Sequence, residues 1–127
     1  MTKTRTETDS FGPLEVPADK YWGAQTQRAI PAFTVSGLTT RDRPDLLVDF
    51  ALVKQAAARA NVLAGALDPA IAAWIERAAV KVAGGAHHDQ FPLDLVQGGG
   101  GTATNMNMNE VLANLANVDA GAKLGAY

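Results

Sequence analysis

One segment near the C-terminal end of the chain combines residue types that can bind an anion. Gln97 is followed by four consecutive glycines, by Thr102 and then by a run of hydroxyl and amide side chains that leads into an apolar pattern. Glycines let the backbone turn sharply and bring its N–H groups close to a ligand. The first N–H groups of a helix also attract negative charge. A carboxylate or phosphate is therefore expected near Thr102, while a flexible linker before a capped helix is the structural alternative.

The spacing of these glycines argues against the two common nucleotide-binding motifs. A phosphate-binding P-loop needs Gly-Lys-Ser/Thr at its end, whereas Thr102 follows Gly101 directly. A dinucleotide fingerprint needs a preceding strand and a βαβ unit, and no second alternation of strand and helix follows. A carboxylate held by backbone N–H groups and the Thr102 hydroxyl remains open.

Other residues that could do chemistry are expected to have structural roles. His87 and His88 are adjacent and no third ligand lies at a helical offset, so we expect a surface loop and no metal site. Arg28 is expected in a buried ion pair or an interface contact. Glu110 fits either a capping box or a buried charge partner. The sequence shows no defensible Ser–His–carboxylate set, so no catalytic residue is assigned.

The composition limits the class of protein. With 127 residues, 47% of them hydrophobic and 19% charged, the chain is expected to form one globular domain. A formal net charge of −2 without a basic patch argues against nucleic acid as a partner. No apolar run reaches the length of about 18 residues that a membrane span needs, and the N-terminal segment is not a signal peptide. With no cysteine present, these features predict a cytoplasmic protein.

The elements before the glycines are predicted to be a hairpin and helices. The turn signal Phe11-Gly12-Pro13 lies within an extended stretch, residues 1–18, whose two halves can pair. A short helix is expected over residues 19–30, with Asp19 as its N-cap and Pro31 as its stop. Residues 37–43 are predicted to be a loop.

Two longer helices follow and should form an antiparallel pair, because the connection between them is short. The first begins at Pro44 and ends at Gly65. The second begins at Asp68-Pro69 and ends at Gly84-Gly85. The apolar stripe predicted for the first helix is Leu46, Phe50, Val53, Ala57, Ala60 and Ala64. The stripe predicted for the second is Ile71, Ile75, Ala78 and Val82.

The last helix follows the glycines, which an extended segment over residues 91–96 approaches. Its beginning is ambiguous, because asparagines and methionines alternate over residues 105–109 with a period that suits a strand. Further on, the spacing is helical: Met108, Val111, Leu115, Val118 and Ala122. This stripe continues to the end of the sequence without a cap. We therefore expect it to be covered by other chains or by more of a longer protein.

Three segments together resemble the fumarase/aspartase superfamily. They are residues 16–29, residues 89–92 (Asp-Gln-Phe-Pro) and residues 97–114, in which the glycine run leads into Asn-Met-Asn-x-Asn-Glu-Val-Leu-Ala-Asn. The similarity stays in register from about Arg5 to the end. It implies a mainly α-helical N-terminal lyase domain over residues 1–127, with a short extended or hairpin N-terminal segment, that leads into a long-helix bundle. It also implies a homotetramer and the reversible elimination from a dicarboxylate substrate to give fumarate. We expect no cofactor.

The resemblance assigns roles to residues of the glycine loop, defined as residues 97–101, and of the helix start. Thr102 matches the family's substrate-carboxylate hydroxyl, and Gly100 and Gly101 match the backbone turn beside it. Asn105 matches a family asparagine that shapes the loop. Thr104 and Asn105 complete the candidate substrate-binding residues. The family's catalytic serine lies in a Gly-Ser-Ser-x-Met-Pro-x-Lys-x-Asn loop that this sequence lacks, so the chain alone is expected to be inactive.

Two segments favour different members of the superfamily. Residues 22–28 resemble class II fumarases. Residues 97–102 are closer to the aspartase pattern Gln-Gly-Gly-Ala-Gly-Thr than to the fumarase pattern Gln-Thr-Gly-Ser-Gly-Thr. Because the resemblance implies that the loop contacts substrate, the prediction is a portion of an aspartate ammonia-lyase, which converts L-aspartate to fumarate and ammonia. Class II fumarate hydratase is the first alternative, and a non-catalytic helical interaction module is the alternative outside enzymes.

Overall fold

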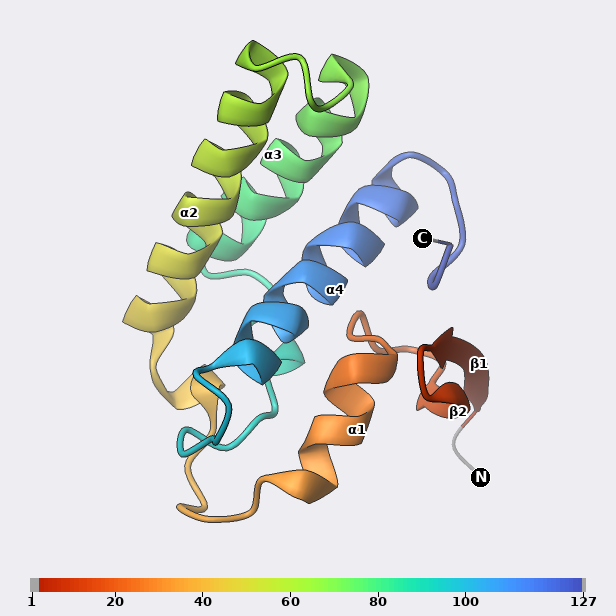
Figure 1. Cartoon of the computed structure of the whole chain (residues 1–127), viewed down its shortest axis with the longest axis vertical. Coiled ribbons are helices and arrows are strands. Elements are labelled where there is room, and N and C mark those ends of the chain that lie inside the picture. The colour runs from red at the N-terminus through yellow and green to blue at the C-terminus, as the bar shows by residue number, and fades with distance from the viewer. Residues whose placement is uncertain (1–2, 127) are drawn as a thin grey trace.

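The computed structural model describes residues 3–126 (Figure 1). In chain order the elements are β1 (Thr4–Asp9), β2 (Gly12–Pro17), α1 (Ala24–Ala32), the 3₁₀ turn η1 (Thr40–Asp42), α2 (Pro44–Leu63), α3 (Pro69–Ala83), the 3₁₀ turn η2 (His88–Gln90) and α4 (Thr102–Asp119). The predicted mainly helical fold with an N-terminal hairpin is confirmed. The turn η1 lies within the segment that was expected to be a loop.

The N-terminal hairpin is antiparallel, and Asp9 pairs with Gly12 across its turn. Gly12 has φ of 106°, a conformation that L side chains rarely adopt. The Arg28 guanidinium of α1 donates to the Asp9 carboxylate through Nε at 2.7 Å and Nη2 at 3.0 Å. Arg28 thus forms an ion pair that holds the hairpin against α1, although its side chain is half-buried rather than buried as expected.

The prediction for α1 was wrong at both ends. The helix begins at Ala24 with Gly23 as its N-cap, and Pro31 lies inside it. Asp19 cannot serve as the cap, because it lies five residues before the first helical residue and pairs with Lys20 on the surface. Pro31 occupies the last turn, where the helix loses only the hydrogen bond that the proline nitrogen cannot donate.

Helices α2 and α3 lie side by side as an antiparallel pair (Figure 1), and their predicted bounds and short connection are confirmed. Asp68 caps α3, because its Oδ1 accepts a hydrogen bond of 2.7 Å from the Ala70 N–H.

The apolar face predicted for α2 is displaced, since Leu47 is fully buried whereas Val53 is 63% exposed. Alanines occur on every side of this helix, so their spacing does not define one face. On α3, Ala78 and Val82 are buried as predicted, whereas Ile71 is exposed.

Helix α4 lies between α1 and the α2–α3 pair (Figure 1) and contacts all three helices. Met108, Val111 and Leu115 are buried, as the spacing predicted. The expected continuation of the stripe to the end of the chain was wrong, because the helix stops at Asp119. Ala122 already lies outside it, after Gly121 turns the backbone at φ of 80°.

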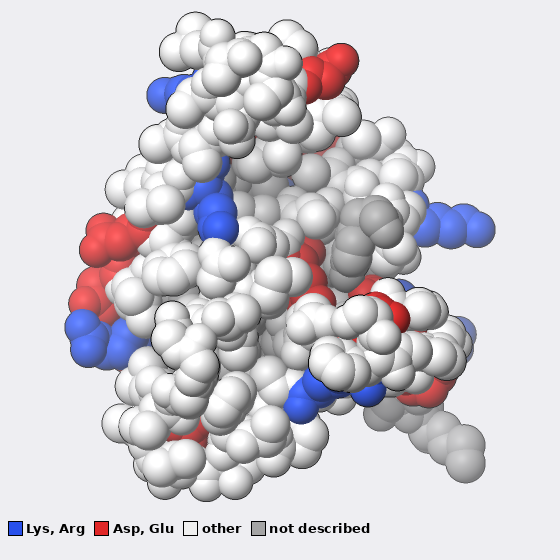
Figure 2. Space-filling model, viewed as in Figure 1, with Lys and Arg blue, Asp and Glu red and all other residues white. Residues whose placement is uncertain are grey.

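Within the helices, the exposed large apolar side chains concentrate on α2 and α3 rather than on α4, and they are Leu52, Val53, Leu63, Ile71 and Val80. Outside the helices, Phe11, Val35, Leu38 and Val96 are also exposed. Only Val118 of the predicted α4 stripe is substantially exposed within the helix. Figure 2 shows charged side chains in small scattered groups on a mostly uncharged face. Across residues 3–126, no helix has both the length and the apolar character required to span a membrane.

Candidate anion site at the glycine loop

Three consecutive glycines give the loop its shape. Gly99, Gly100 and Gly101 have φ of 77°, 68° and 80°, and Gly101 is the N-cap of α4. A Cβ added at any of them would meet no atom within 4 Å. The requirement for glycine therefore comes from the left-handed backbone and not from close packing.

The first amides of α4 point out of the helix without an intrahelical acceptor. Gly101 offers no side chain to cap them. The Asn105 N–H already bonds to the Gly101 carbonyl at 3.1 Å, and the Thr104 N–H bonds to Gln97 Oε1 at 3.2 Å. Thr102 and Ala103 thus present N–H groups at the positive end of a helix of 18 residues.

The two threonine hydroxyls have different partners. Thr102 is exposed, and its hydroxyl donates to the Gly99 carbonyl at 2.8 Å. Thr104 is half-buried, and its hydroxyl donates to Gln97 Oε1 at 3.0 Å. Thr104 therefore braces the loop against the helix. Thr102 has the freer position for contact with a ligand.

All five candidate substrate-binding residues line one surface hollow of about 520 Å³. This glycine-loop hollow is formed by Gly100, Gly101, Thr102, Thr104, Asn105, Leu46 and Phe50. The apolar side chains come from α2 and the polar groups from the loop and the start of α4. Its lining contains hydrogen-bond donors but no charged side chain. Such a surface suits a small anion with an apolar portion, and the roles of the five residues remain predictions.

A buried carboxylate supports the segment that leads to the loop. Asp94 is 6% exposed and accepts hydrogen bonds from the Ser36 hydroxyl at 2.7 Å and from the Val96 N–H at 2.8 Å. The N–H groups of residues 35–37 also donate to it. The Ser36 hydroxyl, followed by the backbone donors, holds the pKa of Asp94 far below its ordinary value. Gln97 Nε2 donates to the Asp94 carbonyl at 2.7 Å and so connects this anchor to the glycine loop.

A second buried carboxylate joins α4 to the start of α1. Glu110 is 4% exposed and accepts hydrogen bonds from the N–H groups of Gly23, Gln25 and Thr26 at 2.9, 2.7 and 3.1 Å. The Thr26 hydroxyl adds a bond of 2.6 Å. Glu110 of α4 is thus a buried acceptor for the N–H groups at the start of α1, and it does not form a capping box in α4. No local pattern indicates a cap that comes from so far along the chain.

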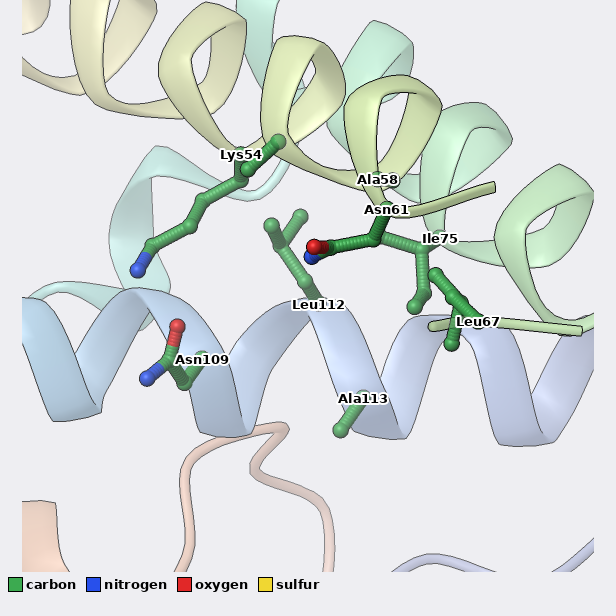
Figure 3. Close-up of a pocket in the computed structure, with 9 residues that line it drawn as sticks. Lys54, Ala58, Asn61, Leu67, Ile75, Asn109, Leu112 and Ala113 are labelled. Carbon is green, nitrogen blue, oxygen red and sulfur yellow. The ribbon is translucent and has the colours of Figure 1, made fainter. Parts of the chain in front are cut away.

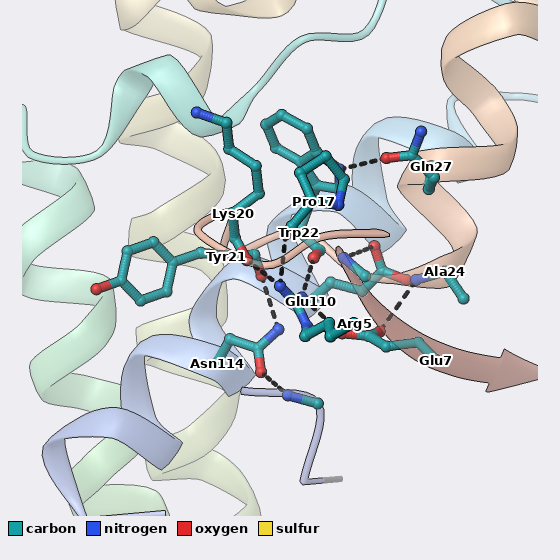
Figure 4. Close-up of polar contacts among 12 residues, drawn as sticks. Arg5, Glu7, Pro17, Lys20, Tyr21, Trp22, Ala24, Gln27, Glu110 and Asn114 are labelled. Atoms are coloured by element: carbon teal, nitrogen blue, oxygen red, sulfur yellow. Dashed lines mark hydrogen bonds and ion pairs between the residues drawn. The ribbon is translucent and has the colours of Figure 1, made fainter. Parts of the chain in front are cut away.

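The hairpin side of this junction is also closed by polar contacts (Figure 4). Arg5 donates to the carbonyls of Pro17, Lys20 and Trp22 at 2.9, 2.7 and 2.7 Å. Asn114 of α4 donates to the Tyr21 carbonyl at 2.8 Å. The segment between β2 and α1 is therefore held from both sides, which fixes α4 and the loop before it.

The two adjacent histidines follow α3: His87 is the N-cap of η2, and His88 is the first residue of η2. His87 has φ of 61°, and its ring meets the Tyr21 ring edge-on with the two ring centroids 5.1 Å apart. His88 Nε2 lies 2.8 Å from the Val82 carbonyl. Both rings therefore pack against the fold. Over the described part of the chain, no three His, Asp or Glu side chains are grouped as a metal site would require.

Comparison with known proteins places this arrangement in a family. The lyase family model matches residues 12–125. The chain is 52% identical over 123 residues to fumarate hydratase class II of Methylorubrum extorquens, which covers 97% of this chain and 26% of the relative. It is 48% identical to the mitochondrial fumarate hydratase of Saccharomyces cerevisiae, with 96% of this chain and 25% of the relative covered. The chain thus spans about a quarter of the length of these relatives.

Solved structures agree with the sequence relatives. A fumarate lyase:delta crystallin from Brucella melitensis superposes with a TM-score of 0.96 at 41% identity, over 98% of this chain and 29% of that chain. A class II fumarase from Schistosoma mansoni gives 0.86 at 33% identity, over 97% of this chain and 26% of that chain.

The aspartate ammonia-lyase prediction is not supported by the names of these relatives, which fit the fumarate hydratase alternative better. The chain belongs to the lyase family, as an N-terminal portion of the fumarase/aspartase superfamily.

Proposed function

We propose that this chain forms the N-terminal part of a class II fumarate hydratase, a hydro-lyase that interconverts malate with fumarate and water. The observation that carries the proposal is the 52% identity over 123 residues to an enzyme of that name. The glycine-loop hollow supports it, because its lining offers donors suited to a carboxylate beside an apolar wall.

The hollow would hold one carboxylate of the dicarboxylate substrate. The N–H groups of Thr102 and Ala103 lie at the positive end of α4, and the Thr102 hydroxyl must exchange the Gly99 carbonyl for a substrate oxygen. Loss of a proton next to a carboxylate increases the negative charge on that group. Donors that are already positioned stabilise this charge without reorganisation. The proton-abstracting serine that the resemblance implies is not part of this sequence.

The experiment follows fumarate absorbance in the full-length protein that carries this chain. We expect fumarate to form from malate and not from aspartate. Turnover of aspartate alone would favour the ammonia-lyase, whose loop pattern residues 97–102 resemble. Turnover of neither substrate would contradict the proposed function.

The proposal includes a homotetramer of the full-length protein. The exposed apolar side chains on α2 and α3 are the surface on this chain that further parts of the assembly could cover. Light scattering coupled to size exclusion measures the mass of the assembly. A monomeric mass for an active full-length enzyme would contradict this part of the proposal.

A further inference from the structure

We propose that Lys54 is a positioning residue for the glycine-loop hollow, because its ammonium fixes the Asn105 amide so that the amide nitrogen serves a bound carboxylate. This inference rests on the proposed function and adds a residue that does not line the hollow itself. Lys54 lies on α2, whereas Asn105 lies in the first turn of α4. The contact therefore joins two elements that together form the walls of the hollow.

The orientation of the amide follows from the chemistry of the contact. Lys54 Nζ donates to Asn105 Oδ1 at 2.6 Å. An ammonium has only donors, so the atom facing it must be the amide oxygen and the nitrogen must point elsewhere. Asn105 Nδ2 donates to no other group among residues 3–126. Because Asn105 lines the hollow, this nitrogen is the side-chain donor left for a carboxylate there.

The Lys54 ammonium is partly buried and has no carboxylate partner among residues 3–126. Figure 3 shows the side chain running from α2 toward α4, beside a second pocket of about 300 Å³ that includes Ala58 and Leu112. Partial burial lowers the pKa of the Lys54 ammonium. Among residues 3–126, no carboxylate forms an ion pair with it.

The charge of Lys54 reaches the hollow through Asn105. The lining of the hollow carries no cation, although its proposed ligand is an anion. A hydrogen bond from an ammonium polarises the amide and strengthens its N–H donors. The partly dehydrated charge also contributes a favourable potential at short range. Lys54 thus supplies positive charge without a direct contact to substrate, which distinguishes it from a catalytic residue.

The test compares Lys54→Met, Lys54→Arg and Lys81→Met in the full-length protein. Met keeps the aliphatic packing but removes the donor, whereas Arg restores a donor and a charge. Lys81 is the matched control, because it also reaches α4 from a neighbouring helix and contacts Asp119, at the end of α4 away from the hollow. The readouts are kcat and KM for malate, the Kd for succinate by calorimetry, and the melting temperature.

Lys54→Met should raise KM and the succinate Kd about tenfold, the size expected for the loss of one charge-assisted contact. The value of kcat should fall less than about threefold, because the carboxylate is already charged in the bound substrate and gains only part of a further charge as the proton is lost. Lys54→Arg should recover most of the loss, and Lys81→Met should leave both constants unchanged.

Unchanged KM and Kd in Lys54→Met, with only a lower melting temperature, would overturn the inference and leave Lys54 as a packing residue. A wild-type protein that binds succinate but converts no malate would contradict the proposed function, while the Kd values still decide the inference. Failure of the wild type to bind succinate would overturn both.

Discussion

Glu110 and Thr26 are 84 positions apart in the chain, yet the Glu110 carboxylate accepts a hydrogen bond of 2.6 Å from the Thr26 hydroxyl. The same carboxylate accepts hydrogen bonds from the N–H groups of Gly23, Gln25 and Thr26, so a side chain of α4 satisfies donors at the start of α1. The glycine loop and the start of α4 are fixed relative to α1 and the hairpin through this contact. The geometry of the candidate site therefore depends on a residue outside the hollow.

Replacement of Glu110 by glutamine should destabilise the fold. The amide retains one acceptor but brings an NH₂ group against the N–H groups of α1, and buried donors without acceptors cost about 1–3 kcal/mol each. We expect the free energy of unfolding in urea to fall by about 2–3 kcal/mol. Glu76→Gln is the control, because its ion pair with Arg59 is exposed and contributes about 0–1 kcal/mol. Equal effects of the two substitutions would contradict the capping role.

Asp94 should make stability depend on pH in the acid range. Its pKa is lowered in the folded protein from an ordinary value of 3.8, chiefly by the Ser36 hydroxyl. A group with a lowered folded pKa stabilises the protein above its unfolded pKa, and this stability is lost as the pH falls toward the folded pKa. Wild type should therefore melt above Asp94→Asn at about pH 7, and the difference should shrink as the pH falls below the ordinary value. A difference that stays constant down to the most acidic pH would contradict this account.

Asp68 and Glu110, which cap α3 and the start of α1, show what the sequence could and could not predict. Asp68-Pro69 is a local cap signal, and the helix it predicts is present with the expected bond to the Ala70 N–H. The predicted start of α1 was wrong because the acceptor for its first N–H groups is Glu110, which no short-range pattern connects to Gly23. A sequence without alignment contains no signal for such a pairing.

The buried side of α2 and the residues that support the glycine loop were not predicted, for related reasons. Alanine is found both in tight helix contacts and on surfaces exposed to solvent. The spacing of apolar residues therefore could not show which side of the alanine-rich α2 is buried, and Leu47 rather than Leu46 lies in the core. The glycine loop was readable because its φ values demand glycine at consecutive positions. Its supports, Asp94 and Lys54, come from segments whose approach is set only by tertiary packing.

Alanine at Gly100 should be costly, whereas alanine at Gly98 should be tolerated. Gly100 has φ of 68°, and an L residue in the left-handed region loses about 1–2 kcal/mol. Gly98 does not have a positive φ, and a Cβ there meets no atom within 4 Å. We expect a drop of about 1–2 kcal/mol in unfolding free energy for Gly100→Ala and less than about 0.5 kcal/mol for Gly98→Ala. Similar losses at both positions in chemical denaturation would show that the loop conformation is not the cause.

The 127-residue chain by itself should expose apolar surface and show no lyase turnover. Leu63, Val53 and Val80 are 89%, 63% and 55% exposed on α2 and α3. Such a surface is expected to bind an apolar dye and to promote self-association. Light scattering and dye fluorescence measure this on the purified chain, with the full-length protein as control. A dye-negative monomer, or measurable conversion of malate by the chain alone, would count against this view.

The role proposed for Thr102 is to bind a substrate carboxylate, and it can be measured through kcat/KM for malate in Thr102→Val of the full-length protein. Valine keeps the shape but removes the hydroxyl, so kcat/KM should fall about ten- to a hundredfold, as expected for a hydrogen bond to a charged group. Thr104→Val is the matched control, because the Thr104 hydroxyl is engaged by Gln97, and its loss should be smaller. An unchanged kcat/KM in Thr102→Val, or a larger loss in Thr104→Val, would contradict the claim.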